Sequence, residues 1–485
     1  MDRIVGVYCN TRLPITIIMD QSFSYFSDKE DTIAAISTPL GTGGLGIVRI
    51  SGKNAVSIGD RIFEGKVLPS QAESHTLTFG KIVGVKTKEK IDEVFLAVMK
   101  APRSYTKEDM VEITSHGSSF ILYKILKQAL DCGARLAYPG EFTFRAFLNG
   151  RIDLAQAEAV AEVIKAKTDL SLKVALSHLE GYLSEKLNSF RDRLIEILAN
   201  VEVQIDFTEE DLEPKDKDII LAELKKIENE LSFLLSTYDE GKILKDGLRI
   251  VIVGKPNVGK SSLLNAFLKE ERAIVTPFPG TTRDAISEEA NFKGIPVRLV
   301  DTAGFRVSKD TIELEGIKRT KLEINRADMI LWVVDASQKL DQDELDLENQ
   351  IKDYKHLVVL NKIDLASPEN ISELGKKLKE KVRKKISALK EQGINELIDT
   401  IASLAITIDK DSNGDVILTN LRHKDSLTRA NDAVLKARKS LEDNMSFEFL
   451  ALDLRIALDS IGEIVGKTVT EDILNKIFLD FCIGK

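Results

Sequence analysis

The sequence predicts three kinds of domain: an α+β domain, an all-α helical domain, and a doubly wound α/β domain inserted into the helical one. Three observations support this multidomain fold class. The 485 residues exceed what one hydrophobic core accommodates. Short β-branched runs alternate with helical segments in the middle of the chain. On both sides of that middle, apolar residues recur every three or four positions, as in amphipathic helices.

The predicted boundaries divide the chain into five segments. Residues 1–30 are an N-terminal extension of unclear role, 31–148 the α+β domain, 149–245 and 405–485 the two parts of the helical domain, and 246–404 the α/β domain. Helices on both sides of the α/β segment favour one helical domain with an insertion. Two independent helical domains are the alternative, and Met19 is an alternative start of the natural protein.

Composition is ordinary for a soluble globular protein, with 43% hydrophobic and 30% charged residues. These values argue against global disorder, and no apolar run approaches the roughly 18 residues of a membrane span. The N-terminal stretch LPITIIM is too short for a secretory signal, so we expect a cytoplasmic protein without a membrane partner. Cys9, Cys132 and Cys482 lie far apart, which argues against a disulfide framework and for a reducing compartment.

The net charge of −9 requires any nucleic-acid partner to meet a local basic surface. The best linear candidate is KKLKEKVRKK, residues 376–385. A charged run at helical spacing is more often a solvated helix face, and we predict that structure here.

Residues 31–148 contain short alternating runs separated by glycine-rich or polar turns, among them GIVRISG, HTLTFGKIV and EVFLAVM. Such runs predict the strands of a compact α+β domain.

Apolar stripes at helical spacing predict the helical domain. The first stripe comprises Leu179, Leu183, Leu187, Phe190, Leu194 and Leu198, and the second Ile220, Leu224, Ile227, Leu231 and Leu234. DEGKILKDG, residues 239–247, is interpreted as a linker into the α/β domain. Near the C-terminus, Leu450, Leu454 and Leu458 share one face. Thr470, followed by two acids, is typical of a helix start.

The most specific motif of the α/β segment is GKPNVGKS, from Gly254 to Ser261. Its glycines allow backbone N–H groups to surround phosphates, Lys260 supplies a cation to the β and γ oxygens, and the Ser261 hydroxyl can bind Mg²⁺. The preceding LRIVIVG and the following SLLNAFLK supply the strand and helix that this motif requires.

Further motifs follow in the order and spacing of a GTPase. DTAG, beginning at Asp301, can hold Mg²⁺ through water and sense a γ-phosphate through the Gly304 N–H. In NKID, the Asp364 carboxylate can accept both N1–H and the exocyclic amine of guanine, so we predict GTP rather than ATP. Ser387-Ala388-Leu389 fits the loop that closes over the base.

GTTRD, residues 280–284, makes Thr282 a candidate Mg²⁺ ligand and switch residue. Phe305 stands directly after DTAG, where many regulatory GTPases have a glutamine that orients water. Phenylalanine cannot do so, and hydrolysis therefore requires another side chain, a partner protein or a cation.

Four segments outside these motifs carry a closer resemblance: DTIAAISTPLGTGGLGIVRISG, SYTKEDMVEITSHG, PGEFTFRAFLNGRIDLAQAEAV and the terminal FCIGK. Together with the GTPase motifs, they resemble the MnmE (TrmE) family of tRNA-modifying GTPases, from Asp31 to Lys485. The resemblance implies a constitutive homodimer whose N-terminal domain binds 5-formyl- or methylene-tetrahydrofolate.

By motif position, the resemblance assigns folate contacts to Arg49, Glu112, Arg151 and Lys485. Without it, Arg49 or Glu112 would be interpreted as a surface ion-pair residue. The family usually has lysine at the place of Arg151 and arginine at that of Tyr138. Cys482 resembles the family's cysteine in FCIGK, which either reacts with a carbon adduct or lines the folate pocket.

The resemblance also implies K⁺ beside the phosphates, with Asn257, Thr276, Phe278 and Thr281 as ligands, Phe278 through its backbone. A P-loop asparagine can equally stabilise the loop. Glu313 matches the family's catalytic glutamate, which would replace the missing glutamine; a helix-start acid is the alternative. Motifs and resemblance together assign the nucleotide site to Asn257, Val258, Gly259, Lys260, Ser261, Ser262, Thr276, Pro277, Phe278, Pro279, Gly280, Thr281, Thr282, Asp301, Thr302, Ala303, Gly304, Asn361, Lys362, Asp364, Ser387, Ala388 and Leu389.

The expected activity is therefore K⁺-stimulated GTP hydrolysis coupled to tRNA modification. With a MnmG-like FAD- and NADH-dependent partner, such an enzyme adds an aminomethyl or carboxymethylaminomethyl group to C5 of the wobble uridine, and tetrahydrofolate supplies the carbon. A ribosome-assembly or signalling GTPase without chemistry on RNA is the alternative. It leaves PGEFTFRAFLNG and the C-terminal thiol unexplained.

Overall fold

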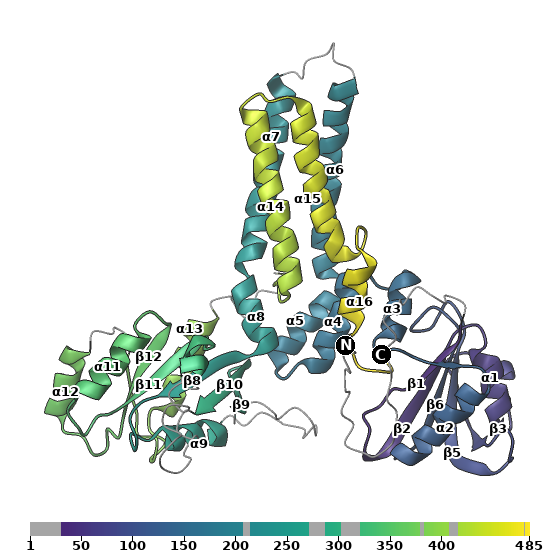
Figure 1. The fold of residues 1–485 in the computed structure, drawn as a ribbon, viewed down its shortest axis with the longest axis horizontal. Helices are drawn as coiled ribbons and strands as arrows, with labels where there is room; N and C mark the ends of the chain where they lie inside the picture. Colours follow the sequence, from purple (N-terminus) through teal and green to yellow (C-terminus); the bar gives the residue numbers. More distant parts are fainter. Residues whose placement is uncertain are drawn as a thin grey trace, which may run out of the picture.

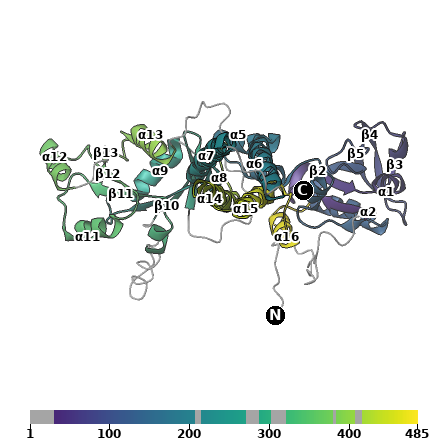
Figure 2. The ribbon, with the colours of Figure 1, turned by 90° about the horizontal axis from the view of Figure 1, so that it is seen from above.

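The computed structural model describes residues 31–206, 214–270, 287–301, 321–378, 383–406, 416–479 and 481–485. Two mixed α/β parts flank a helical part, and both lie at the same end of its long helix bundle (Figures 1 and 2). In the described parts of the chain, no helix is both long and apolar enough for a membrane span. The predicted multidomain fold class is confirmed, while the domain boundaries stay a prediction.

The N-terminal part is a seven-stranded sheet in the order β3-β4-β5-β6-β2-β1-β7, antiparallel except for the β1–β7 pair. Its strands are β1 (Ile33–Ile36), β2 (Thr42–Ser51), β3 (Phe63–Gly65), β4 (Leu77–Val83), β5 (Lys90–Met99), β6 (Met110–Ser118) and β7 (Arg135–Leu136). Helices α1 (Ala55–Ile62) and α2 (Ser119–Asp131) bury their apolar sides on one sheet face. The predicted strand runs lie in β2, β4 and β5.

The opposite sheet face is covered only in part. At one end, Phe142 of α3 (Glu141–Leu148) packs with Tyr105 and with Ile483 from the C-terminus. At the other end, Leu77 and Phe79 are 70% and 59% exposed. One face of the sheet therefore combines a covered end with an exposed apolar end.

The helical part joins segments from before and after the inserted domain in one core. Its helices are α4 (Leu154–Lys165), α5 (Asp169–Glu180), α6 (Tyr182–Asp206), α7 (Pro214–Ser236), α8 (Tyr238–Asp246), α14 (Leu421–Glu442), α15 (Phe447–Val465) and α16 (Glu471–Leu479). Helices α6, α7, α14 and α15 run side by side as a bundle (Figure 1). Leu187 and Leu224 share that core with Leu454, which confirms an insertion rather than two helical domains.

Two predictions about this part were wrong. Leu179 belongs to α5 rather than to the stripe of α6, because Gly181, with φ of 100°, ends α5 in a left-handed conformation that favours glycine. Residues 239–247 are not a linker, since most of them form α8. The buried Tyr238 and Leu244 of α8 anchor this helix to the bundle core and to the inserted domain, respectively.

The inserted part is a six-stranded sheet in the order β13-β12-β11-β8-β10-β9, parallel except for β9. Its strands are β8 (Leu248–Val253), β9 (Ser287–Phe292), β10 (Ile295–Asp301), β11 (Met329–Asp335), β12 (His356–Asn361) and β13 (Arg383–Lys385). The described helices are α9 (Lys260–Glu270), α11 (Gln342–Ile351), α12 (Pro368–Lys377) and α13 (Ile394–Ala405). The basic stretch 376–385 is not one helix face, because α12 ends at Lys377 and residues 383–385 pair with β12.

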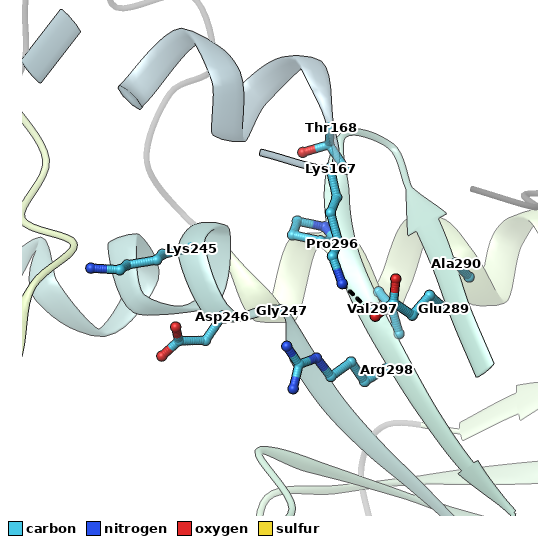
Figure 3. A pocket seen from close by; sticks show the side chains of 10 residues that line it. All are labelled: Lys167, Thr168, Lys245, Asp246, Gly247, Glu289, Ala290, Pro296, Val297 and Arg298. Carbon is cyan, nitrogen blue, oxygen red and sulfur yellow. Dashed lines mark hydrogen bonds and ion pairs between the residues drawn. The ribbon is translucent and has the colours of Figure 1, made fainter. Parts of the chain in front are cut away.

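The inserted part packs firmly on the helical part. Val174 of α5 and Leu244 of α8 lie in the same hydrophobic core as the strands β8 and β10. The only described hollow of note lies at this junction and not at a predicted ligand site (Figure 3). There Lys167, between α4 and α5, forms an ion pair with Glu289 of β9. The inserted part is therefore docked on α5 and α8 by apolar contacts as well as by its two chain connections.

Candidate functional site

The loop after β8 has the shape that a phosphate site requires. Gly254, Asn257 and Gly259 have φ of 146°, 65° and 100° between the end of β8 and the start of α9. A Cβ at Gly259 would lie 2.2 Å from Asn361 Nδ2, so this position requires glycine. Because the loop ends at a helix N-terminus, its geometry suits an anion.

Two side chains of this loop are placed for phosphate and Mg²⁺. Lys260 Nζ donates to the carbonyl oxygens of Gly254 and Lys255, each at 2.7 Å, which holds the ammonium inside the loop. Ser261 Oγ donates to Asp301 Oδ2 at 3.1 Å. A hydroxyl and a carboxylate this close are hard oxygen ligands, and they fit Mg²⁺ bound with nucleotide phosphates.

The NKID residues divide their work between loop support and base recognition. Asn361 Nδ2 donates to Val258 O at 2.8 Å, and Asn361 Oδ1 accepts from the Ala388 N–H at 2.9 Å. This amide therefore joins the phosphate loop to the base loop. Lys362 pairs with Asp335 at 2.7 Å, a residue that sequence reasoning missed. Its signal was a carboxylate at the carboxyl end of a parallel strand.

Asp364 is kept as a carboxylate for guanine. A hydrogen bond from the Ser387 side chain, and then the charge of Lys390, lowers the pKa of Asp364. An ionised carboxylate can accept two N–H groups at once, as the guanine edge requires. In the base loop, Ser387 and Ala388 are buried, whereas Leu389 is 84% exposed.

Several predicted residues fall outside the described ranges, and their predictions stay untested. They are Thr276, Pro277, Phe278, Pro279, Gly280, Thr281, Thr282, Thr302, Ala303, Gly304 and Glu313.

A second site lies in the N-terminal part, where the predicted folate residues come together. Arg49 of β2 faces Glu112 of β6 across the sheet, and the guanidinium contacts Glu112 Oε1 at 2.8 Å and 2.7 Å. Arg49 Nη1 also donates to the carbonyl oxygen of Gly484, 435 positions away in the chain. The C-terminus thereby becomes part of this N-terminal pocket.

The other two predicted residues complete the N-terminal pocket. Arg151 Nη1 donates to the Tyr105 carbonyl oxygen at 3.0 Å. Burial, and then the charge of Arg49, lowers the pKa of Lys485. Cys482 is exposed, and its carbonyl oxygen accepts from the Gly140 N–H at 3.3 Å. The pocket is thus rich in cations, as a ligand with carboxylates would require.

Comparison with known families agrees with this architecture. The family model described as "GTP-binding protein TrmE N-terminus" matches residues 32–151, and the model described as "MnmE helical domain" matches residues 154–482. The chain belongs to the MnmE family. The match spans most of the chain, including the sheet that carries Arg49 and both segments of the helix bundle.

Curated relatives have the same length and organisation. The tRNA modification GTPase MnmE of Clostridioides difficile (strain 630) is 47% identical over 459 residues, which cover 94% of this chain and 99% of the relative. That of Alkaliphilus oremlandii (strain OhILAs) is 46% identical over 458 residues, with the same coverage. A solved structure of Aquifex aeolicus Era bound to GDP.AlF4- is 27% identical, covers 38% of this chain and 66% of that one, and has a TM-score of 0.27, too low to carry an argument.

Proposed function

We propose that this MnmE-family chain hydrolyses GTP to drive modification of the wobble uridine of tRNA, with a folate as carbon donor. GTP hydrolysis and a role in tRNA modification follow from the family and the nucleotide loop. The observation that carries the further steps is that one chain holds two separate sites. One is a phosphate loop with a guanine-reading carboxylate, and the other is a pocket of converging cations.

The first proposed step concerns the nucleotide. Lys260 holds the phosphates, Ser261 and Thr282 bind Mg²⁺, and Asp364 reads guanine. K⁺ takes Asn257, Thr276, Phe278 and Thr281 as ligands, and Glu313 orients the attacking water. The exposed Asn257, at a positive φ in the loop, supports a role for its amide oxygen beyond packing.

The cation and the base are tested by two measurements. GTP turnover in KCl should greatly exceed turnover in NaCl at equal ionic strength, and equal rates would remove Asn257 from the mechanism. Glu313→Ala should lose nearly all hydrolysis while GTP affinity is largely kept. Retained turnover would reduce Glu313 to a structural acid.

The second proposed step is binding of 5-formyl- or methylene-tetrahydrofolate in the N-terminal pocket. Arg49, Arg151 and Lys485 suit the glutamate tail, and Glu112 suits the ring N–H groups of the pterin. When bound, the folate supplies a one-carbon unit. Calorimetry with 5-formyl-tetrahydrofolate on the full chain should show saturable binding, and no heat of binding would contradict this step.

The proposed assembly is a homodimer that works with a MnmG-like FAD- and NADH-dependent partner. The uncovered sheet face supports the dimer, because Leu45, Leu77, Phe79 and Phe95 are 69%, 70%, 59% and 48% exposed on neighbouring strands. Exposed apolar clusters of this kind mark interaction surfaces. Phe79→Glu should therefore shift the chain towards monomer in sedimentation, whereas an unchanged dimer would place the interface elsewhere.

The decisive experiment is mass spectrometry of wobble nucleosides from cells lacking this chain. Loss of a C5 aminomethyl or carboxymethylaminomethyl group is expected. Unchanged nucleosides would instead favour an assembly or signalling GTPase without chemistry on RNA.

A further inference from the structure

An aromatic ring that none of the motifs singled out lies at the centre of the N-terminal pocket. The guanidinium carbon of Arg151 is 4.7 Å from the centroid of the Tyr105 ring, and that of Arg49 is 5.5 Å from the same centroid. Arg151 also donates to the Tyr105 carbonyl oxygen at 3.0 Å. One residue therefore contacts both arginines, one of them through both its ring and its backbone.

The arrangement has an electrostatic problem that a ring can relieve. Arg49 and Arg151 carry like charges next to one ring, and Lys485 adds a third cation close enough for the charge of Arg49 to lower the pKa of Lys485. Glu112 pairs with Arg49. The negative face of an aromatic ring attracts guanidinium groups without neutralising them. A carboxylate in the place of the ring would instead neutralise the charge that attracts an anionic ligand.

The ring itself is fixed from three sides. Tyr105 packs with Phe142 and Ile483 in the cluster on the covered sheet face. Its hydroxyl lies 2.9 Å from Thr143 Oγ1. Burial raises the pKa of Tyr105, so the hydroxyl stays neutral and the ring brings no charge of its own. A ring held in this way can set the directions of both guanidinium groups before any ligand arrives.

We propose that Tyr105 is the positioning residue of this pocket, whose ring holds Arg49 and Arg151 side by side for an anionic ligand. The proposal rests on the proposed folate function for the identity of that ligand. It adds that binding depends on the ring more than on the Tyr105 hydroxyl, and that Arg151 and Tyr105 act as a pair.

The test is a set of variants of the full chain, titrated with 5-formyl-tetrahydrofolate by calorimetry. Tyr105→Leu removes the ring, and we expect about tenfold weaker binding, the scale of two lost cation–π contacts in a partly desolvated site. Tyr105→Phe keeps the ring and should restore binding to within about twofold. Arg151→Lys should weaken binding in the Tyr105 background and have little further effect in Tyr105→Leu, because the planar contact is already gone.

A matched control removes a ring with the same kind of contact elsewhere. Tyr238 of α8 is buried, and Lys424 Nζ lies 4.3 Å from the centroid of its ring. Tyr238→Leu should leave folate affinity unchanged. GTP turnover of every variant reports that the chain is folded.

The outcomes separate this proposal from the proposed function. If the unaltered chain binds no 5-formyl-tetrahydrofolate, the folate function fails. If the unaltered chain binds it and Tyr105→Leu binds equally well, the positioning role fails. If Tyr105→Phe is as weak as Tyr105→Leu while both hydrolyse GTP normally, the hydroxyl matters instead of the ring, and the proposal is overturned.

Discussion

The nucleotide site and the N-terminal pocket are built in opposite ways. Each nucleotide motif is a few consecutive residues at the carboxyl end of a parallel strand, and the sheet order brings those ends together. The N-terminal pocket joins Arg49 to Glu112 across the sheet and to Gly484 at the other end of the chain. The comparison teaches that the first site depends on local backbone geometry and the second on long-range docking.

The largest effect should come from the local site. Lys260→Ala removes the ammonium that is held between two loop carbonyls, and GTP turnover should fall by about 100-fold or more. Folate affinity should not change, because no fold element is lost. Steady-state turnover and calorimetry on the same preparation check both expectations.

The control for that variant lies on the same helix. Lys269→Ala, at the far end of α9, removes an exposed ion pair with Glu391 and should leave turnover unchanged. If Lys269→Ala were as damaging as Lys260→Ala, the loss would reflect helix stability and not phosphate binding.

The next effect should come from the pocket. Arg49→Ala breaks the contacts with Glu112 and Gly484, and affinity for 5-formyl-tetrahydrofolate should fall by roughly tenfold to 100-fold with GTP turnover kept. Lys81→Ala is the matched control, because Lys81 forms an exposed ion pair with Glu64 on the same sheet. An equal loss in both variants would show that general charge, and not the pocket, attracts the ligand.

A smaller effect concerns the helices between the two sites. Glu158 of α4 is buried and bonds to Arg422 and His423 of α14. Against the cost of burial, the charges of His423 and Arg422 lower its pKa from 4.5 to about 2. Removing one partner of such a buried pair costs about 3 kcal/mol, so Glu158→Gln should lower the urea midpoint of the helical part at pH 7.

The pH dependence of that contribution has a definite sign. Because the folded pKa of Glu158 lies below the unfolded value, its stabilisation is present above pH 4.5 and is lost as pH falls towards 2. Burial also lowers the pKa of His423, so acidification below pH 6.5 costs further stability as the unfolded chain takes up the proton. The midpoint of the unaltered chain should therefore fall more steeply between pH 5 and pH 3 than that of Glu158→Gln. Parallel slopes would contradict this.

The smallest effect should appear at the junction in Figure 3. Lys167 and Glu289 are 46% and 32% exposed, and solvent screens their attraction, so Lys167→Ala should change stability by less than about 1 kcal/mol. Leu244→Ala, in the shared apolar core, should cost more, about 2–3 kcal/mol. The reverse order in thermal unfolding would show that the ion pair, and not apolar packing, docks the inserted part.

The sequence alone determined most of the inserted α/β part. Lys260, Ser261 and Asp364 could be assigned because each motif carries its own loop geometry and chemistry in a few residues. The helix stripes were also readable, since burial repeats with the 3.6-residue period. The one residue added to this site, Asp335, contacts Lys362 across neighbouring parallel strands, a contact that no local pattern specifies.

Only the tertiary structure decided how distant segments meet. No spacing predicts that Gly484 reaches Arg49, or that the Tyr105 ring lies against two arginines, because these contacts require α3 and the C-terminal segment to cover one end of the sheet. The interpretation of residues 239–247 as a linker failed for the same reason. Leu244 and Tyr238 are stabilised by cores formed from remote segments, so the helix there depends on packing more than on its own sequence.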